Sequence, residues 1–178
     1  MSTIVDDLDS RLGARVKIER ERRGWSLTDL AERSGVSRAM INKVERGAWF
    51  AARRTQGFPV LVAVEGNEVL GFASFGEWRG AWPGYRYTVE HSVHVRAEMR
   101  GRGVGRALVE ALFPAALALG KHVMIGGIDA ANHASIRFHA RLGFERVACF
   151  REVGHKFGRW LDLIFMQRFL DAPGSPRG

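Results

Sequence analysis

The chain has 178 residues, of which 46% are hydrophobic and 26% charged, and this balance excludes the disordered and collagen-like classes. Its longest apolar stretch, 111–119, is too short to cross a bilayer, and the acidic first ten residues do not resemble a secretory leader. The lone Cys149 cannot form an internal disulfide, and no Cys and His cluster has metal-ligand spacing. We therefore expect a cytoplasmic protein without membrane or metal partners, with Cys149 in its core.

The net charge of +8 fits either nucleic acid or a polyanionic small molecule as a partner. Residues 1–47 hold 10 Lys and Arg against 8 Asp and Glu, whereas residues 48–178 hold 17 against 11. Most of the basic excess therefore lies in the larger part.

Three short helices are predicted before residue 47. The first has apolar residues between Leu12 and Ile18 and ends at Gly24, the second covers 27–33 after the N-cap Ser26, and the third follows the N-cap Ser37.

The pattern after Gly47 changes to that of strands. Strands are predicted at 58–64, 68–76, 88–95, 122–128, 144–150 and 160–169, and helices at 106–120 and from the N-cap Asn132 to 142. The continuous apolar run in 122–128 predicts burial on both faces of that strand. Residues 171–178 form a Pro-, Gly- and Ser-rich tail.

The sharpest local signal is the segment 100–105, RGRGVG, between a predicted strand and a predicted helix. Glycines at alternate positions let backbone N–H groups turn toward an anion at the positive end of the helix, as a diphosphate requires. The dinucleotide pattern fails because Arg106 stands at its third glycine, and the Walker pattern lacks Gly-Lys-Ser/Thr. The alternative is that the glycines only make a tight turn.

Four segments carry a family resemblance: TVEHSVHV (88–95), RGRGVGRALVEAL (100–112), GKHVMIGGIDAANHASIRFHARLGF (120–144) and KFGRWLDLIFMQ (156–167). They resemble the GCN5-related N-acetyltransferases, in the phosphinothricin and methionine sulfone (sulfoximine) acetyltransferase branch. The resemblance covers roughly 48–170 and implies an α/β fold with a mixed sheet splayed to admit the pantetheine arm. It implies acetyl-CoA as co-substrate and the α-amino group of a small amino-acid analogue as acceptor.

The same resemblance implies the residues that bind acetyl-CoA. Backbone groups of one strand would pair with the pantetheine arm and hold the thioester carbonyl, the Gly-rich loop would hold the diphosphate, and a loop asparagine would contact the arm. These residues are Val93, His94, Val95, Arg100, Gly101, Arg102, Gly103, Val104, Gly105, Arg106 and Asn132. Asn132 has a second, compatible interpretation as a simple helix N-cap.

The resemblance also implies the reacting groups. Glu90 matches the proposed general base, which an ammonium acceptor needs before it attacks a thioester, and its alternative is an exposed strand residue. His139 stands where relatives outside this branch carry a tyrosine thought to protonate the leaving thiolate, and its alternative is a helix-surface histidine. Arg79, His91 and Ser92 match positions near the acceptor, although the loop around Gly80-Ala81-Trp82-Pro83 departs from the branch.

Residues 11–47 resemble the helix-turn-helix of repressor-like transcription regulators, a DNA-binding family. That resemblance implies DNA contacts by Ser37, Arg38, Asn42 and Lys43. We therefore predict three parts: a truncated helix-turn-helix segment at 1–47, an acetyltransferase domain lacking its first strand and helices at 48–170, and the tail. Residues 48–66 resemble the stretch that starts at the end of the family's second helix.

Two functions remain open from the sequence. The favoured one is an N-acetyltransferase, and the alternative is a DNA-binding regulator with a degenerate acetyl-CoA-binding domain. The junction at Gly47–Ala48 has two interpretations: a rearranged product that folds poorly, or helices that cover the sheet left bare by the missing ones. We expect loose packing of the two parts, low stability or a homodimer, and at most weak, salt-sensitive DNA binding.

Overall fold

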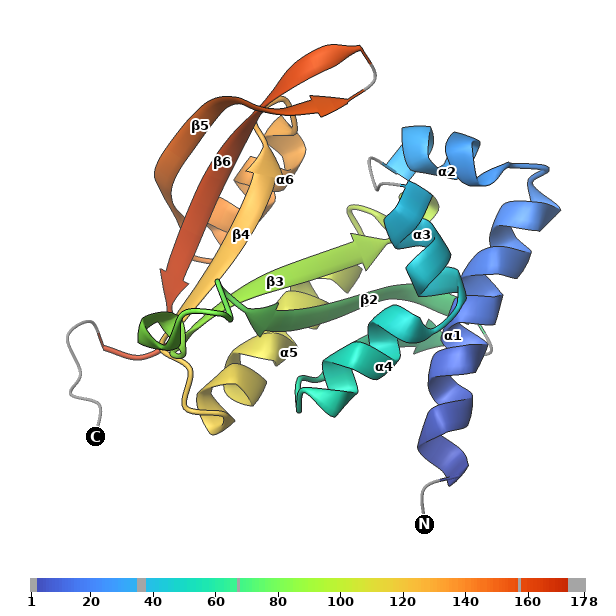
Figure 1. The fold of residues 1–178 in the computed structure, drawn as a ribbon, viewed down its shortest axis with the longest axis horizontal. Coiled ribbons are helices and arrows are strands. Elements are labelled where there is room, and N and C mark those ends of the chain that lie inside the picture. The colour runs from blue at the N-terminus through green and yellow to red at the C-terminus, as the bar shows by residue number, and fades with distance from the viewer. Residues whose placement is uncertain (1–2, 35–37, 67, 157, 173–178) are drawn as a thin grey trace. The chain divides into compact units, whose positions relative to one another are not determined.

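The computed structural model describes residues 3–34, 38–66, 68–156 and 158–172 (Figure 1). The chain divides into two compact units, residues 1–58 and 59–178. Within the described residues, no helix is long and apolar enough to cross a membrane. The cytoplasmic location and the domain division at Gly47–Ala48 stay predictions.

The described part of the first unit forms the helices α1 (Thr3–Arg22), α2 (Leu27–Ser34), α3 (Arg38–Glu45) and α4 (Ala48–Thr55). Helix α1 approaches α3 closely at Gly13, where a Cβ atom would lie 2.6 Å from the carbonyl oxygen of Val44. Farther along α1, the guanidinium of Arg20 donates two hydrogen bonds, of 2.7 and 3.0 Å, to the carboxylate of Glu45. Both side chains are nearly buried, so this paired charge fixes the packing of α1 on α3.

The predicted N-cap of α2 is confirmed, because Ser26 Oγ accepts a hydrogen bond from the backbone N–H of Asp29 at 3.1 Å. The predicted cap Ser37 lies outside the described residues. Residues 48–55 are helical, as the family resemblance implied, and the predicted strands begin after this helix. Within this helix Trp49 and Arg53 are one turn apart, and the guanidinium lies 5.4 Å from the indole ring centre, a contact that supports the helix.

The second unit is built on a six-stranded mixed sheet in the order β1-β2-β3-β4-β6-β5. All neighbouring strands are antiparallel except β3 and β4, which run parallel. The strands are β1 (Val60–Glu65), β2 (Glu68–Glu77), β3 (Thr88–Val95), β4 (Val123–Asp129), β5 (Glu145–Lys156) and β6 (Arg159–Phe169). The short 3-10 helices η1 (Pro83–Tyr85) and η2 (Ala97–Met99) flank β3.

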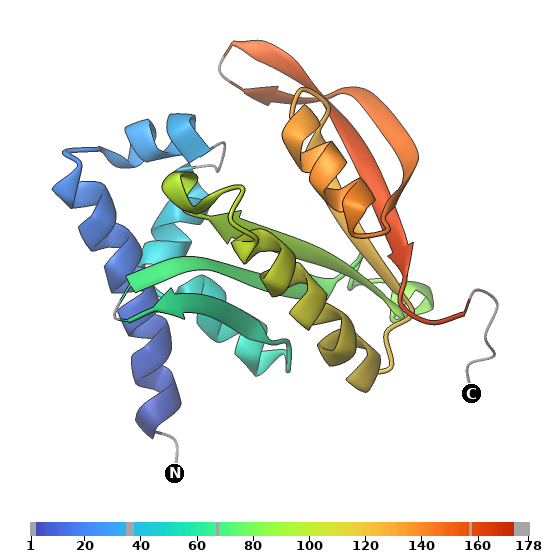
Figure 2. The same ribbon diagram turned by 180° about the vertical axis from the view of Figure 1, so that it is seen from behind.

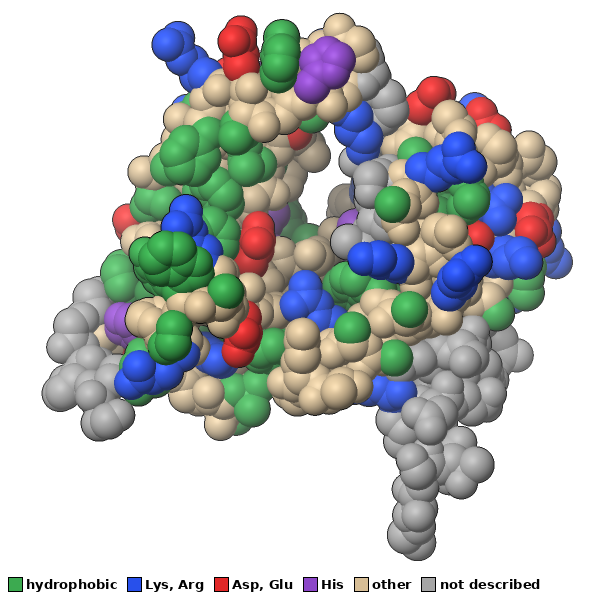
Figure 3. All heavy atoms as spheres, in the orientation of Figure 1, with side chains coloured by type: hydrophobic (Ala, Val, Ile, Leu, Met, Phe, Trp, Pro, Cys, Tyr) green, Lys and Arg blue, Asp and Glu red, His purple; other side chains and the backbone are tan. Residues whose placement is uncertain are grey.

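Both long helices of this unit, α5 (Val104–Ala118) and α6 (His133–Arg141), cover the same face of the sheet (Figure 2). The unit's core lies under them, where Val89, Val109, Leu112 and Met124 are fully buried. On the other face, hydrophobic side chains gather over β5 and β6 (Figure 3). The sheet thus has one helix-covered face and one face to which α5 and α6 contribute nothing.

Two burial predictions are wrong. Strand β4 alternates between buried and less buried residues, because only its helix-covered face carries the Met124 and Ile128 side chains into the core. Cys149 is exposed, since it lies on β5, the edge strand, most of whose residues are solvent-accessible.

Strands β3 and β4 pair over only three positions, from Thr88 opposite Val123 to Glu90 opposite Ile125. Beyond Glu90, β3 pairs only with β2, and beyond Ile125, β4 pairs only with β6. Figure 1 shows the two strands diverging from this point. The splay expected from the family resemblance is therefore present in the middle of the sheet.

Candidate active site

The Gly-rich loop ends in the first turn of α5. Gly101 and Gly103 have φ angles of 77° and 84°, in the left-handed region that glycine adopts without strain. Gly103 is the N-cap of α5 and has no side-chain hydrogen bond, so the first amides of the helix are not capped by a side chain. A Cβ atom at Gly101 or Gly103 would meet nothing within 4 Å, so backbone conformation rather than crowding requires glycine there.

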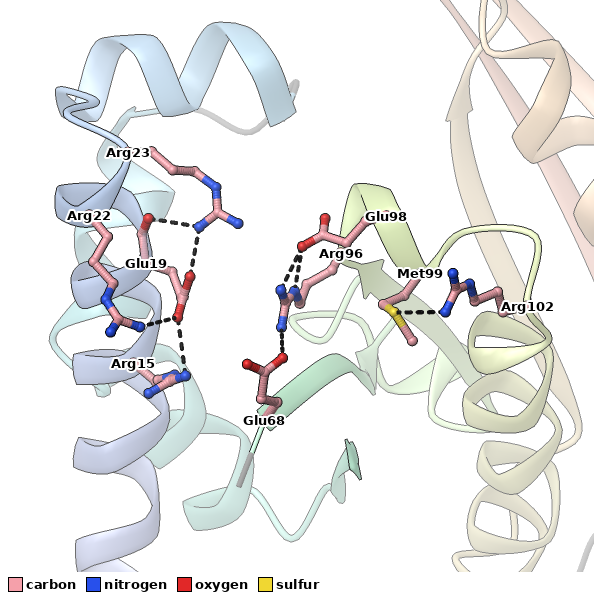
Figure 4. A network of polar contacts seen from close by, with 9 residues as sticks. All are labelled: Arg15, Glu19, Arg22, Arg23, Glu68, Arg96, Glu98, Met99 and Arg102. Carbon is pink, nitrogen blue, oxygen red and sulfur yellow. Dashed lines mark hydrogen bonds and ion pairs between the residues drawn. The ribbon is translucent and has the colours of Figure 1, made fainter. Parts of the chain in front are cut away.

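The three arginines of this loop differ in their partners. Arg106 donates to the carboxylate of Glu110 at 2.8 Å, which offsets its charge. Arg102 lies beside Met99 in Figure 4, and within the described residues neither Arg100 nor Arg102 forms an ion pair. Arg100 and Arg102 are therefore the loop cations most available to a diphosphate.

Arg96 precedes this loop and is engaged on both sides. Its guanidinium donates to Glu68 at 2.7 Å and to Glu98 at 2.6 Å (Figure 4). This pairing holds the end of β3 against the start of β2, and it offsets the Arg96 charge beside the loop.

Residues 93–95 lie on β3 after the splay has begun, so their backbone groups on the β4 side have no partner in that strand. An extended ligand could add there as a strand would. His94 is exposed and its ring stacks near Phe72, with ring centres 4.9 Å apart. Val93 and Val95 point to the other face and are half-buried.

Glu90 lies at the last paired position of β3, and its half-buried side chain is on the face opposite α5 and α6. Its Oε1 atom is 3.1 Å from the position that a Cβ atom on Gly127 of β4 would occupy. The aromatic ring of Phe165 borders the same point at 3.5 Å and contacts Trp78 edge to face. A carboxylate therefore stands at the opening of the splay beside an aromatic wall.

Arg79 follows β2 on the loop that leads to η1. It is exposed, and its φ of 50° is unusual for a residue with a side chain. The guanidinium carbon lies 5.9 Å from the ring centre of Trp78 and 5.8 Å from that of Tyr85. The cation is thus held beside the aromatic wall next to Glu90.

The structure does not bring His91 together with Glu90. Alternation along β3 places Ser92 on the face of Glu90 and His91 on the helix-covered face, where it is only 6% exposed. His139 of α6 is 4% exposed, so the alternative of a helix-surface histidine is wrong. The two rings meet, with Nε2 atoms 3.2 Å apart.

Asn132 caps α6, because its Oδ1 accepts a hydrogen bond from the backbone N–H of Ser135 at 3.0 Å. Its contact with CoA stays a prediction.

Of the residues implied in DNA contacts, Arg38, Asn42 and Lys43 are exposed on α3, and Ser37 lies outside the described residues.

Sequence reasoning missed Gly126 and Gly127. A Cβ atom at Gly126 would lie 3.1 Å from His91 Nε2, and one at Gly127 would crowd Glu90. Two consecutive glycines inside an apolar strand were the available signal, since they mark a close approach by other groups. No group of three metal-ligating side chains occurs among the described residues.

Comparison with known proteins agrees with this geometry. Residues 25–144 match the acetyltransferase (GNAT) family. The chain belongs to that family. The match starts inside the segment that resembles a helix-turn-helix, and a DNA-binding role for that segment stays a prediction. The protein is an N-acetyltransferase that uses acetyl-CoA.

Two relatives and one solved structure are similar to this acetyltransferase in sequence and fold. It is 53% identical to the L-methionine sulfoximine/L-methionine sulfone acetyltransferase of Salmonella typhimurium over 136 residues, which are 76% of this chain and 79% of the relative. It is 39% identical to a phosphinothricin N-acetyltransferase of Streptomyces coelicolor, over 70% of this chain and 74% of the relative. An acetyltransferase structure from Salmonella typhimurium with its cofactor acetyl-CoA has a TM-score of 0.69 at 52% identity, over 74% of this chain and 76% of that chain.

Proposed function

We propose that this acetyltransferase transfers the acetyl group of acetyl-CoA to the α-amino group of a small amino-acid analogue such as methionine sulfone, methionine sulfoximine or phosphinothricin. The observation that carries the proposal is the Glu90 carboxylate beside Gly127, at the point where β3 and β4 part. The names of the two relatives support the acceptor class.

In the proposed reaction, Glu90 accepts a proton from the ammonium group of the acceptor, directly or through water. The amine nitrogen then forms a bond to the thioester carbon. The carbon–sulfur bond breaks, and the electron pair leaves with the CoA thiolate, which takes a proton from solvent. A backbone N–H of residues 93–95 stabilises the negative charge that develops on the carbonyl oxygen.

The diphosphate of acetyl-CoA is assigned to the loop 100–106. Its support is the pair of left-handed glycines, the start of α5 without a side-chain cap, and the cations Arg100 and Arg102, which form no ion pair in the described part of the chain. Amides supply directional donors and the arginines supply charge, so the loop uses both means of holding an anion.

Arg79 is assigned to the acceptor. Its guanidinium can donate two parallel hydrogen bonds to a carboxylate or phosphinate, and its left-handed backbone costs about 1–3 kcal/mol, which is typical of functional positions. The neighbouring residues 80–83 set which acceptors fit, since this loop departs from the branch pattern.

His139 was predicted to protonate the leaving thiolate. That role needs an N–H on its Nε2 atom, but Nδ1 of His139 lies 2.7 Å from the carbonyl oxygen of Ser135 and carries the ring proton, which leaves Nε2 an acceptor. We therefore assign His139 no proton transfer, and the thiolate needs none to leave, because an alkyl thiol has a pKa of about 8.5.

Thiol release with acetyl-CoA and a panel of amines tests the proposal. We expect rapid release with methionine sulfone, methionine sulfoximine or phosphinothricin, and none with their N-acetylated forms, which lack a nucleophilic amine. Equal rates with every primary amine, or release only by hydrolysis, would contradict the proposed acceptor class.

DNA and a second copy of the chain are the remaining candidate partners. Arg38, Asn42 and Lys43 are exposed on α3, but residues 1–47 carry a net charge of only +2, which is small for a protein that must neutralise several phosphates. We propose at most weak, salt-sensitive DNA binding, and we keep the homodimer as a prediction for sedimentation measurements.

A further inference from the structure

Two buried histidines meet on the helix-covered face of the sheet, at the apex of the splay. His91 is the first residue of β3 that no longer pairs with β4, and Gly126 is the first residue of β4 that no longer pairs with β3. His139 of α6 reaches the same point, and its Nε2 is 3.2 Å from His91 Nε2. The pair therefore marks where the two strands separate.

The hydrogen bonds fix which nitrogen carries each proton. His139 Nδ1 lies 2.7 Å from the carbonyl oxygen of Ser135, and a contact this short requires that Nδ1–H donates to the carbonyl. In a neutral ring His139 Nε2 then holds a lone pair. It follows that His91 Nε2–H is the donor and His139 Nε2 the acceptor of the bond between the two rings.

Both rings are neutral at physiological pH. Burial lowers the pKa of His91 to about 3, with a further contribution from the nearby His139 ring. Burial also lowers the pKa of His139. His91 Nδ1 is buried and has no hydrogen-bond partner within the described residues, which agrees with a bare nitrogen there rather than an N–H donor.

The surroundings hold the pair in one arrangement. Phe144 contacts both rings, at 5.3 Å between ring centres in each case. A Cβ atom on Gly126 would lie 3.1 Å from His91 Nε2 and 3.3 Å from His139 Nε2, which is tighter than ordinary contact, so both rings would have to shift slightly to admit it. On the other side of His139, Phe138 lies against Gly105 of the diphosphate loop.

We propose that His91 is a positioning residue, which acts through its hydrogen bond to His139 Nε2 and thereby fixes the His139 ring at the apex of the splay. This inference rests on the proposed acetyl transfer within the splay. The neutral pair forms the inner wall against which the thioester is placed, and Phe138 connects that wall with the diphosphate loop. His91 is thus assigned to the thioester wall, away from the acceptor.

Kinetics of four variants test this coupling. His91→Leu removes the donor, and we expect turnover to fall about 10- to 100-fold with little change in KM for acetyl-CoA, because a misplaced wall affects the reacting geometry more than the diphosphate contacts. His91→Gln keeps an N–H donor at similar reach and should recover most of the rate. His91→Asn, whose amide is too short, should not. The exposed His133→Leu on α6 is the matched control and should behave as wild type.

The double variant His91→Leu/His139→Leu decides whether His91 acts through His139. We expect its turnover to equal that of the slower single variant, because either substitution alone already removes the hydrogen bond between the two histidines. Multiplicative losses, full activity of His91→Asn, or a loss in His91→Leu with none in His139→Leu would each overturn the proposal.

Side-chain ¹⁵N spectra of the histidines give a readout that needs no activity. We expect His139 protonated only at Nδ1 and His91 only at Nε2 at pH 7.5, and a shift of the His139 Nε2 signal in His91→Leu that His91→Gln restores. A protonated His139 Nε2, or a signal insensitive to His91→Leu, would overturn the proposal. If no acceptor in the panel is acetylated, the proposed function fails, while the spectra still test the pair.

Discussion

The two faces of the sheet at the splay offer different chemistry within consecutive residues of one strand. Glu90 is half-buried on the face opposite α5 and α6, beside a glycine and an aromatic wall. His91, the next residue, is 6% exposed and neutral among aromatic rings under α6. Because side chains alternate along a β-strand, Glu90 can accept a proton on one side of the reacting centre, while the neutral His91 on the other side takes no part in proton transfer.

The largest expected effect is on the Glu90 face. Glu90→Gln keeps the shape of the side chain but cannot accept a proton, so turnover at pH 7 should fall by about 10²–10⁴-fold, measured by thiol release. CoA affinity measured by calorimetry should remain within about twofold, because the diphosphate loop is unchanged. A wild-type rate for Glu90→Gln would mean that Glu90 is not the proton acceptor, and the proposed chemical difference between the two faces of the sheet would be wrong.

The next effect concerns the loop that anchors acetyl-CoA at the splay. Gly103→Val forces a β-branched residue to a φ of 84° and should weaken CoA binding by more than about tenfold in calorimetric titration. Arg102→Ala should cost less, and Arg106→Ala least, because Arg106 is already paired with Glu110. A small loss in Gly103→Val beside a larger one in Arg102→Ala would mean that charge rather than backbone geometry holds the diphosphate.

A smaller effect is expected from the glycine beside Glu90. In Gly127→Ala the new methyl group would lie 3.1 Å from Glu90 Oε1, so the carboxylate must shift and turnover should fall about tenfold with CoA affinity retained. Gly154→Ala on β5 is the matched control, since its methyl group would make an ordinary contact at 3.5 Å with Leu161. If both variants behave alike, Gly127 has no particular relation to the carboxylate.

On the helix-covered face, His91 should make the free energy of unfolding depend on pH. Because the pKa of His91 is about 3 in the folded protein and 6.5 in an exposed chain, the unfolded state binds more protons below pH 6.5. The stabilising contribution of a neutral His91 is therefore complete above pH 6.5 and declines as the pH falls toward 3. Urea unfolding at pH 7 and pH 4.5 should show a larger loss in wild type than in His91→Gln, and equal losses would mean that His91 titrates normally.

Much of this site could be predicted from the sequence because its signals are local. The strand 88–95, the Gly-rich loop and the Asn132 cap depend on residues close together in the chain, and the structure has all three. The contact of His91 with His139 joins residues 48 positions apart, and only the packing of α6 on the sheet creates it. Likewise, Cys149 has a core-like residue type, but the strand order places it on an edge strand.

The assignment of Glu90 as the proton acceptor is tested most directly by comparing wild type and Glu90→Gln across pH with methionine sulfone as acceptor. A free amine needs no base, so the ratio of their turnover rates should shrink steadily as pH rises toward the pKa of the α-amino group. A ratio that stays constant from pH 6.5 to pH 9.5 would contradict the assignment and leave Glu90 with a role in acceptor placement alone.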